Sequence, residues 1–290
     1  MSGADSVDAA RRITVQRLTY FPVKGCAGTD VATCAVVRTG LEHDRTFMIV
    51  NAVDGSFHSQ RTLPAMAAVR PAVVDGGAGL RLTADGVESL RHDVRPEGGR
   101  RAVSMFGRPL GEAVDQGDTV ADWFSEVLKA PVRLVRAPGD FDRDGWGETP
   151  GKVAYADAHA LLIASQASLD DLNARISAHG GRPVPMDRFR PNIVLDGCAE
   201  PHAEDEMRRL EIGTARLAYA TRATRCAVPM VDQLTGVRDG PEPIRTLARY
   251  RREPEFDNKV SFGMKAAVVR PGILSVGDAV EALFRSGQPA

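Results

Sequence analysis

A cysteine next to an arginine is the residue in this sequence whose surroundings best suit chemistry. Cys226 follows Arg225 directly, and Arg222 and Thr224 stand just before them. Positive charge near a thiol lowers its pKa and favours the thiolate, which is the form that binds soft metal ions or attacks electrophiles. The alternative is a buried cysteine beside arginines that point into solvent. The segment therefore predicts either a reactive thiol or an ordinary core residue.

A second group of candidate residues could bind a phosphate. Lys24 and Gly25 follow an expected strand, and the backbone amides and the lysine of such a turn can hold an anion. Arg45, Arg61 and Arg190 also stand close to expected strands or turns. Each would be a solvated charge in isolation, but several arginines that converge on one cavity would form an oxyanion site. Spacing along the chain does not show whether they converge.

The remaining candidates give weaker signals. Asp232 lies in the segment 231–236, which reads as a turn, so its carboxylate is expected to bond to the backbone of that turn. No two of the four cysteines have C-x-x-C spacing, and the histidines lack the spacing of metal ligands. A structural zinc site or an iron–sulfur cluster therefore has no support in the sequence.

The elements expected around these residues are mostly β. Short apolar or alternating runs, several of them separated by Gly and Asp turns, predict strands at 13–18, 31–37, 46–50, 192–195, 210–212, 215–220, 266–269 and 273–276. Apolar residues at helical spacing predict helices over 119–129, 168–179 and 243–250. The segment 136–152 is rich in Gly, Pro and charge and predicts a long surface loop or a domain junction. The fold class expected is mostly β with a few helices (α+β), and the regular short strands favour a barrel or sandwich.

The composition limits the classes of partner that we expect for this protein. Lys and Arg number 37 and Asp and Glu 38, so the formal net charge of −1 argues against a nucleic-acid coat protein. No apolar stretch approaches the roughly 20 residues of a membrane-spanning helix, and the first twelve residues do not read as a secretory signal. We expect a cytoplasmic protein without disulfides and without a nucleic-acid or membrane partner.

The motifs together resemble those of the MOSC (molybdenum cofactor sulfurase C-terminal) family, and in particular the mitochondrial amidoxime-reducing component and its bacterial relatives. The matching segments run through nearly the whole chain in the family's order: 20–26, 43–45, 59–61, 165–169, 189–194, 225–226, 231–232, 235–236 and 276–278. The resemblance implies a MOSC N-terminal β-barrel-like domain over 12–135 and a MOSC β-barrel domain over 150–285. It also implies a molybdenum cofactor (molybdopterin) bound between the two.

The same resemblance assigns roles to individual residues. Cys226 falls on the cysteine that ligates molybdenum. The other residues that it places at the pterin and its phosphate are Lys24, Gly25, Arg45, Arg61, Arg190, Asn192, Thr224 and Arg225. His159 stands where the family has a hydroxyl residue, so it is either a substituted cofactor contact or a surface histidine. Asp232 could orient the loop that carries Cys226 or relay protons, with the turn-forming role as the alternative.

The function implied is that of a molybdenum-dependent oxidoreductase that reduces N-hydroxylated (N–O) compounds. We expect neither the ferredoxin domain nor the membrane anchor that some relatives carry, so electrons would come from a separate cytochrome b5-like, flavin or ferredoxin protein. The alternative is a carrier of the molybdenum cofactor or of sulfur that uses Cys226. A third reading is a barrel that binds the cofactor without chemistry. Turnover with an artificial reductant would distinguish an enzyme from a carrier.

Overall fold

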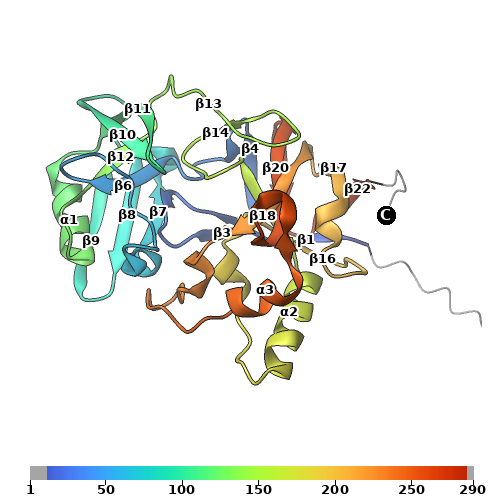
Figure 1. Ribbon diagram of the computed structural model, residues 1–290. Helices are drawn as coiled ribbons and strands as arrows, with labels where there is room; N and C mark the ends of the chain where they lie inside the picture. Colours follow the sequence, from blue (N-terminus) through green and yellow to red (C-terminus); the bar gives the residue numbers. More distant parts are fainter. Residues whose placement is uncertain (1–11, 286–290) are drawn as a thin grey trace, which may run out of the picture.

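The computed structural model describes residues 12–285, and these are mostly β, as the sequence predicts. They form 22 strands and three α helices. Figure 1 shows two parts side by side, one built by the first half of the chain around α1 (Asp118–Leu128) and one built mainly by the second half. Helices α2 (Gln166–Ala178) and α3 (Ile244–Tyr250) lie together on the second part. Within residues 12–285, no helix has both the length and the apolar character that a bilayer crossing needs.

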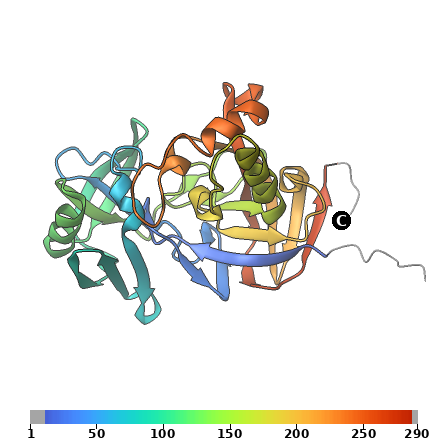
Figure 2. The same cartoon turned by 90° about the horizontal axis from the view of Figure 1, so that it is seen from below.

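The second part is organised by one nine-stranded sheet. Its strands run in the order β22-β17-β18-β20-β15-β16-β1-β3, with β19 paired to β20. Their bounds are β1 (Thr14–Tyr20), β3 (Thr29–Val31), β15 (Leu161–Ser165), β16 (Ile193–Asp196), β17 (Met207–Ile212), β18 (Ala215–Arg225), β19 (Arg252–Glu253), β20 (Lys259–Arg270) and β22 (Val280–Phe284). Strand β1 therefore joins strands that follow it by more than 140 residues, and Figure 2 shows it lying beside them.

This sheet curls back on itself. The amide of Val15 donates to the carbonyl of Asp278 at 2.9 Å, and the amide of Val280 donates to the carbonyl of Ile13 at 2.9 Å. These bonds join the start of β1 to the segment that enters β22, although the paired strands alone leave the sheet open. The sheet is thus barrel-like: backbone hydrogen bonds link β1, its second-last strand, to the opposite edge, but the paired strands within residues 12–285 do not form a closed barrel. Its interior is apolar, with side chains such as Leu18, Ile163 and Leu217 fully buried.

The first part contains smaller sheets around a second core. A five-stranded sheet runs β10-β11-β12-β6-β2, and a three-stranded one runs β7-β8-β9. The bounds are β2 (Val23–Lys24), β6 (Phe47–Asn51), β7 (Arg70–Val74), β8 (Gly79–Ala84), β9 (Val87–Asp93), β10 (Arg100–Met105), β11 (Arg108–Asp115) and β12 (Val132–Arg136). Helix α1 packs Val120 and Phe124 against Ile49, Leu80 and Leu134, which covers apolar faces of both sheets.

Two small sheets complete the fold. Strand β4 (Thr33–Val37) pairs with β5 (Gly40–Leu41) and with β21 (Gly272–Ser275) from near the end of the chain. Strands β13 (Arg143–Asp144) and β14 (Lys152–Val153) form a short ribbon inside the stretch expected to be a loop. The predicted helix over 168–179 is confirmed as α2, which starts two residues earlier because the Ser165 hydroxyl accepts a bond from the Ser168 amide and caps the helix.

Candidate functional site

A cleft of about 430 Å³ brings together most of the residues singled out in the sequence. Its walls come from β2, the segment before β6, the β10–β11 hairpin, β18 and β20, so both parts of the molecule contribute. Eight of the eleven candidate residues line it: Lys24, Gly25, Arg45, Arg61, Arg190, Thr224, Arg225 and Cys226. The arginines that are scattered along the sequence do converge on one cavity. Asn192, His159 and Asp232 lie outside its lining.

Cys226 presents its thiol to this cleft. It directly follows β18, the eleven-residue strand that pairs along its length with β20, so its position is set by the central sheet. Cys226 is exposed, whereas Cys26 and Cys198 are buried. Burial raises the pKa of both buried thiols to about 12, and burial also raises the pKa of Cys34. Among the four cysteines, Cys226 is therefore the one placed to bind or react with a ligand in the cleft.

Lys24 lies at the end of β2 and is buried, with 8% of its surface exposed. Its ammonium donates to the carbonyl of Tyr155 at 2.8 Å and forms an ion pair with Asp157. Burial lowers the pKa of Lys24, while the nearby carboxylate opposes that shift. Burial, the largest single influence, would raise the pKa of Asp157, but the charge and hydrogen bond of Lys24 together with the charges of Lys265 and Arg45 lower that pKa overall. Lys24 is thus a partly neutralised cation in the cleft wall.

Arg45 is held by a buried polar network. Its guanidinium donates to the carboxylate of Asp44 and to the side-chain oxygen of Asn192, the latter at 3.0 Å. Asn192 makes three further bonds, to the Leu162 amide at 3.1 Å, to the Thr19 carbonyl at 3.1 Å and to Asp44 at 3.0 Å. Because Asn192 is 1% exposed and all its bonds are internal, its role in this structure is to position Arg45.

Arg190 approaches Arg45 from the second part. Their guanidinium carbons lie 4.3 and 4.6 Å from the centroid of the Phe21 ring, which is within the range of a cation–π contact. Arg190 donates to the carbonyl of Cys26 at 2.6 Å and to the side chain of Gln233 at 3.0 Å. Burial, followed by the charge of Arg45, lowers the pKa of Arg190 to about 9. No carboxylate within residues 12–285 pairs with it.

Arg225 is a second cation held without a carboxylate. Its guanidinium donates to the carbonyl of Phe262 at 2.6 Å and to that of Phe189 at 3.1 Å. Burial lowers the pKa of Arg225 to about 10. Thr224 precedes it on β18 and also lines the cleft. These bonds fix the strand end from which Cys226 projects.

Arg61 and Gly25 both line the cleft, Arg61 with an exposed side chain and Gly25 as part of a turn. Arg61 is exposed and lies 5.4 Å from the centroid of the Phe106 ring. Gly25 has φ of +89°, a left-handed conformation that favours glycine, and an added Cβ would lie 2.6 Å from the end of Met66. Its carbonyl accepts a bond from Gln60 at 2.7 Å. A glycine suits this turn for backbone reasons, whatever the ligand.

The structure places His159 and Asp232 elsewhere. His159 is fully buried and not a surface residue; its Nδ1 accepts from the Ala160 amide at 3.0 Å, so its Nε2 donates to the Thr149 carbonyl at 3.1 Å. Asp232 accepts from the Leu234 and Thr235 amides at 3.0 and 2.9 Å, which is the turn-forming arrangement. These contacts account for both side chains, and their proposed cofactor and catalytic roles stay predictions.

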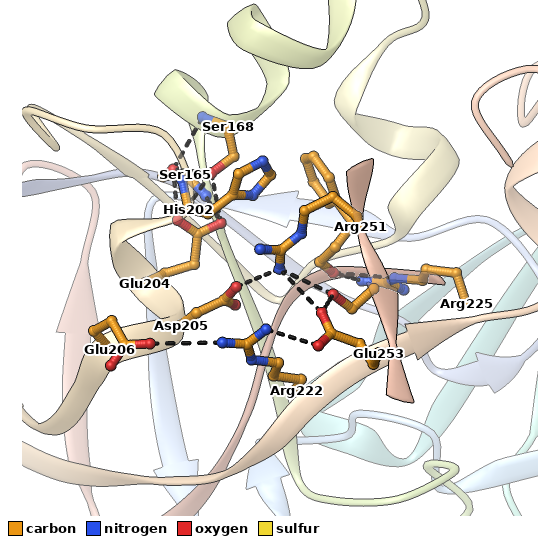
Figure 3. Close-up of polar contacts among 12 residues, drawn as sticks. Ser165, Ser168, His202, Glu204, Asp205, Glu206, Arg222, Arg225, Arg251 and Glu253 are labelled. Atoms are coloured by element: carbon orange, nitrogen blue, oxygen red, sulfur yellow. Dashed lines mark hydrogen bonds and ion pairs between the residues drawn. The ribbon is translucent and has the colours of Figure 1, made fainter. Parts of the chain in front are cut away.

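The sequence analysis did not identify several of the residues that line the cleft. The clearest is Lys265, a charge inside the apolar run 260–269, and this interruption of a strand pattern is the signal that marks it. Arg222, noted above only as a neighbour of Cys226, lines the wall too. It pairs with Glu253 at 2.8 Å and with Glu206 at 3.6 Å, in a network with Asp205 and Arg251 that Figure 3 shows. The aromatic side chains missed at the opening are Phe57, Phe106 and Trp146.

The cations of the cleft fall into two kinds. Arg188 pairs with Asp232 and Asp239, and Arg222 pairs with two glutamates, so both are neutralised. Arg190, Arg225 and Lys265 make no ion pair within residues 12–285. Burying a cation without a counter-charge is unfavourable, and several such cations together favour an anionic ligand. The cleft therefore combines an exposed thiol with an uncompensated positive charge.

Comparison with known proteins agrees with the resemblance seen in the motifs. Residues 12–131 match the MOSC N-terminal beta barrel domain, and residues 150–281 match the MOSC domain. Mitochondrial amidoxime-reducing component 1 from Mus musculus is 31% identical, over 92% of this chain and 81% of that protein. Mitochondrial amidoxime reducing component 2 from Rattus norvegicus is 33% identical, over 92% of this chain and 82% of that protein.

A second kind of relative shares the same two domains. Molybdenum cofactor sulfurase from Oryza sativa subsp. japonica is 29% identical over 89% of this chain, and this chain spans 33% of that protein's length. Both kinds of relative match about nine tenths of the chain. The chain belongs to the MOSC family.

Proposed function

We propose that this protein is a molybdenum-cofactor-dependent oxidoreductase that reduces N-hydroxylated compounds. The observation that carries the proposal is the exposed thiol of Cys226 in a cleft with partly buried cations that lack a counter-charge. The names of the relatives at about 30% identity support the same chemistry. Reduction of an N–OH group consumes two electrons and two protons and releases water.

The residues of the cleft fit such a cofactor. A phosphate monoester carries about −1.5 to −2 charges near neutral pH and needs several cationic or N–H partners when it is buried. Lys24, Arg45 and Arg190 would hold that phosphate, because they come from distant parts of the chain and meet in one cavity. The Cys226 thiolate would ligate the metal, since thiolates suit soft metal ions. The bound cofactor would supply the two-electron redox centre.

The protein's own residues would define where a substrate enters. Phe57, Phe106 and Trp146 line the opening, and the last two are about half exposed. These side chains would exclude water from one side of a bound compound and contact its apolar surface. Electrons would come from a separate redox protein, through a small and transient contact. A cytoplasmic location stays a prediction.

The test starts with the molybdenum content per chain after expression in a host that makes the cofactor. The matched variants are Cys226→Ser and Cys34→Ser, because Cys34 is a half-buried thiol outside the cleft. We expect about one molybdenum per chain in the parent and in Cys34→Ser, and a large loss in Cys226→Ser. A parent that holds no molybdenum beside a loaded family member would refute the proposal.

Turnover separates the enzyme from a carrier. The exposed thiol would equally suit a protein that delivers the cofactor or a persulfide sulfur, which the sulfurase relatives make a specific alternative. With a reduced dye as the electron source, the loaded enzyme should convert many equivalents of an N-hydroxylated substrate per molybdenum. A loaded protein that transfers its cargo to an apoenzyme but gives no turnover would establish the carrier instead.

A further inference from the structure

We propose that Lys265 is a further cation that holds the phosphate end of the bound pterin. This inference rests on the proposed function. Lys265 carries no assigned role in the motifs that identify the family, and it adds to the site a positive charge from the central strand of the sheet.

The fold directs Lys265 into the cleft. It lies within β20, where it is paired with Thr221 of β18 on one side and Leu162 of β15 on the other. Its neighbours Met264 and Ala266 are fully buried in the barrel core. Because successive side chains of a strand point to opposite faces, Lys265 points away from that core, and it lines the cleft together with Leu162.

The ammonium of Lys265 lacks a protein partner. Within residues 12–285 it makes neither a hydrogen bond nor an ion pair, although the other two lysines of the cleft do. Lys24 bonds to Tyr155 and Asp157, and Lys259 pairs with Asp257 at 3.4 Å. The three N–H donors of Lys265 are thus free for a ligand.

The charges that face Lys265 are mainly positive. Arg45, Arg225 and Lys24 repel it, and Asp157 is the one carboxylate that attracts it. Burial, followed by the charges of Arg45 and Arg225, lowers the pKa of Lys265 to about 7. A lysine in this position is unfavourable in the empty protein, and an anion placed among these groups would relieve the repulsion.

The amount of charge points to the phosphate rather than to a neutral part of a ligand. The deep part of the cleft holds five cations (Lys24, Arg45, Arg190, Arg225 and Lys265) against two carboxylates, Asp44 and Asp157. With all five cations protonated, the excess is three positive charges. A phosphate monoester of about −1.5 to −2 charges offsets most of it, whereas a carbonyl or an amide would leave it in place.

The experiment compares Lys265→Met with Lys259→Met. Both lysines lie on β20 and line the cleft, but Lys259 is at the exposed rim and already paired with Asp257. Molybdenum and pterin per chain are measured after dialysis at increasing salt, and the unfolding of the cofactor-free proteins is measured in urea. Lys265→Arg, which keeps the charge, serves as the rescue variant.

Two opposite shifts are expected for Lys265→Met. Its cofactor should dissociate about tenfold more readily than that of the parent, because a charge-assisted bond is lost. Its cofactor-free form should be at least as resistant to urea as the parent, because a repelled cation is removed. If Lys265 only supported the fold, its replacement by Met would reduce both the retention of the cofactor and the resistance to urea. Lys259→Met should match the parent, and Lys265→Arg should retain the cofactor better than Lys265→Met.

Different results would refute the proposed function and the inference about Lys265. If the parent contains neither molybdenum nor pterin, the proposed function fails. If the parent is loaded and Lys265→Met retains the cofactor equally at every salt concentration, Lys265 does not bind it and the inference is overturned. A loss of both cofactor and urea resistance in Lys265→Met would also overturn it, in favour of a structural role.

Discussion

Replacing Asn192 by leucine tests whether this residue positions Arg45. Leucine has a similar volume but neither donates nor accepts hydrogen bonds, so the change removes all four side-chain bonds of Asn192 at once. The amide of Leu162 and the carbonyl of Thr19 lose these bonds in a buried region. Arg45 loses the acceptor that lies 3.0 Å from its guanidinium.

The magnitude follows from the groups left without partners. A buried donor or acceptor that loses its hydrogen bond costs about 1–3 kcal/mol, so two such backbone groups predict a loss of about 2–6 kcal/mol. That is a large part of the 5–15 kcal/mol by which most domains are stable. Arg45 would also be less well fixed, so the cofactor content of the folded protein should fall several-fold.

The assay is urea unfolding of the cofactor-free protein together with molybdenum per chain after loading. Asn173→Leu is the matched control, because Asn173 makes two bonds to the backbone of Val184, at 3.0 and 2.8 Å, and does not line the cleft. It also leaves two backbone groups without partners, so it should lose up to about 2–6 kcal/mol but keep its molybdenum. An Asn192→Leu protein that loses under about 1 kcal/mol, or that loads molybdenum as the parent does, would refute the positioning role.

Two further predictions concern His159 and the pH dependence of stability. His159→Leu removes the hydrogen bond to the Thr149 carbonyl, so the free energy of unfolding should fall by about 1–3 kcal/mol. Trypsin should also cleave faster after Arg143 or Lys152. A loss of molybdenum in this variant would instead support the hypothesis that His159 contacts the cofactor. In the cofactor-free protein the pKa of Lys265 is lowered from 10.5 to about 7, so between these pH values the unfolded chain holds a proton that the folded one has released. The free energy of unfolding should therefore gain a contribution that rises from about pH 7 towards pH 10, and a parent and Lys265→Met with the same pH profile would contradict this.

Local sequence patterns predicted where strands lie better than which strands pair with one another. Alternation marked 13–18 as a strand, and it is β1, but nothing local says that it pairs with β16 and completes the sheet of the second half. The run 31–37 reads as one strand, yet its first residue, Val31, ends β3, which pairs with β1, and 33–37 form β4, which pairs with β21. Tertiary pairing decides this break, because the two strands meet different neighbours.

The site was predictable where its residues stand in recognisable motif segments, and not where the fold brings distant side chains together. Lys24, Arg45 and Cys226 stand in recognisable segments, and all three line the cleft. Asn192 was expected as a cofactor contact from the family resemblance, but its four internal bonds go to β1, to β15 and to the Asp44–Arg45 pair. His159 was expected either at the cofactor or at the surface, and it is buried.

Two unusual features occur together in this cleft: a left-handed backbone conformation at non-glycine residues and a cation without a carboxylate partner. Arg45 and Arg190 have φ of +50° and +57°, a left-handed conformation that costs a non-glycine residue about 1–2 kcal/mol. Arg190 also lies beside other cations without a carboxylate, whereas Arg188, two residues earlier, has an ordinary backbone conformation and two carboxylate partners. Strain and uncompensated charge of this kind persist where a bound group offsets them. A structural cluster of arginines would show counter-ions throughout, as Arg188 and Arg222 do, so the lack of a carboxylate partner at Arg190 favours a site that binds an anion.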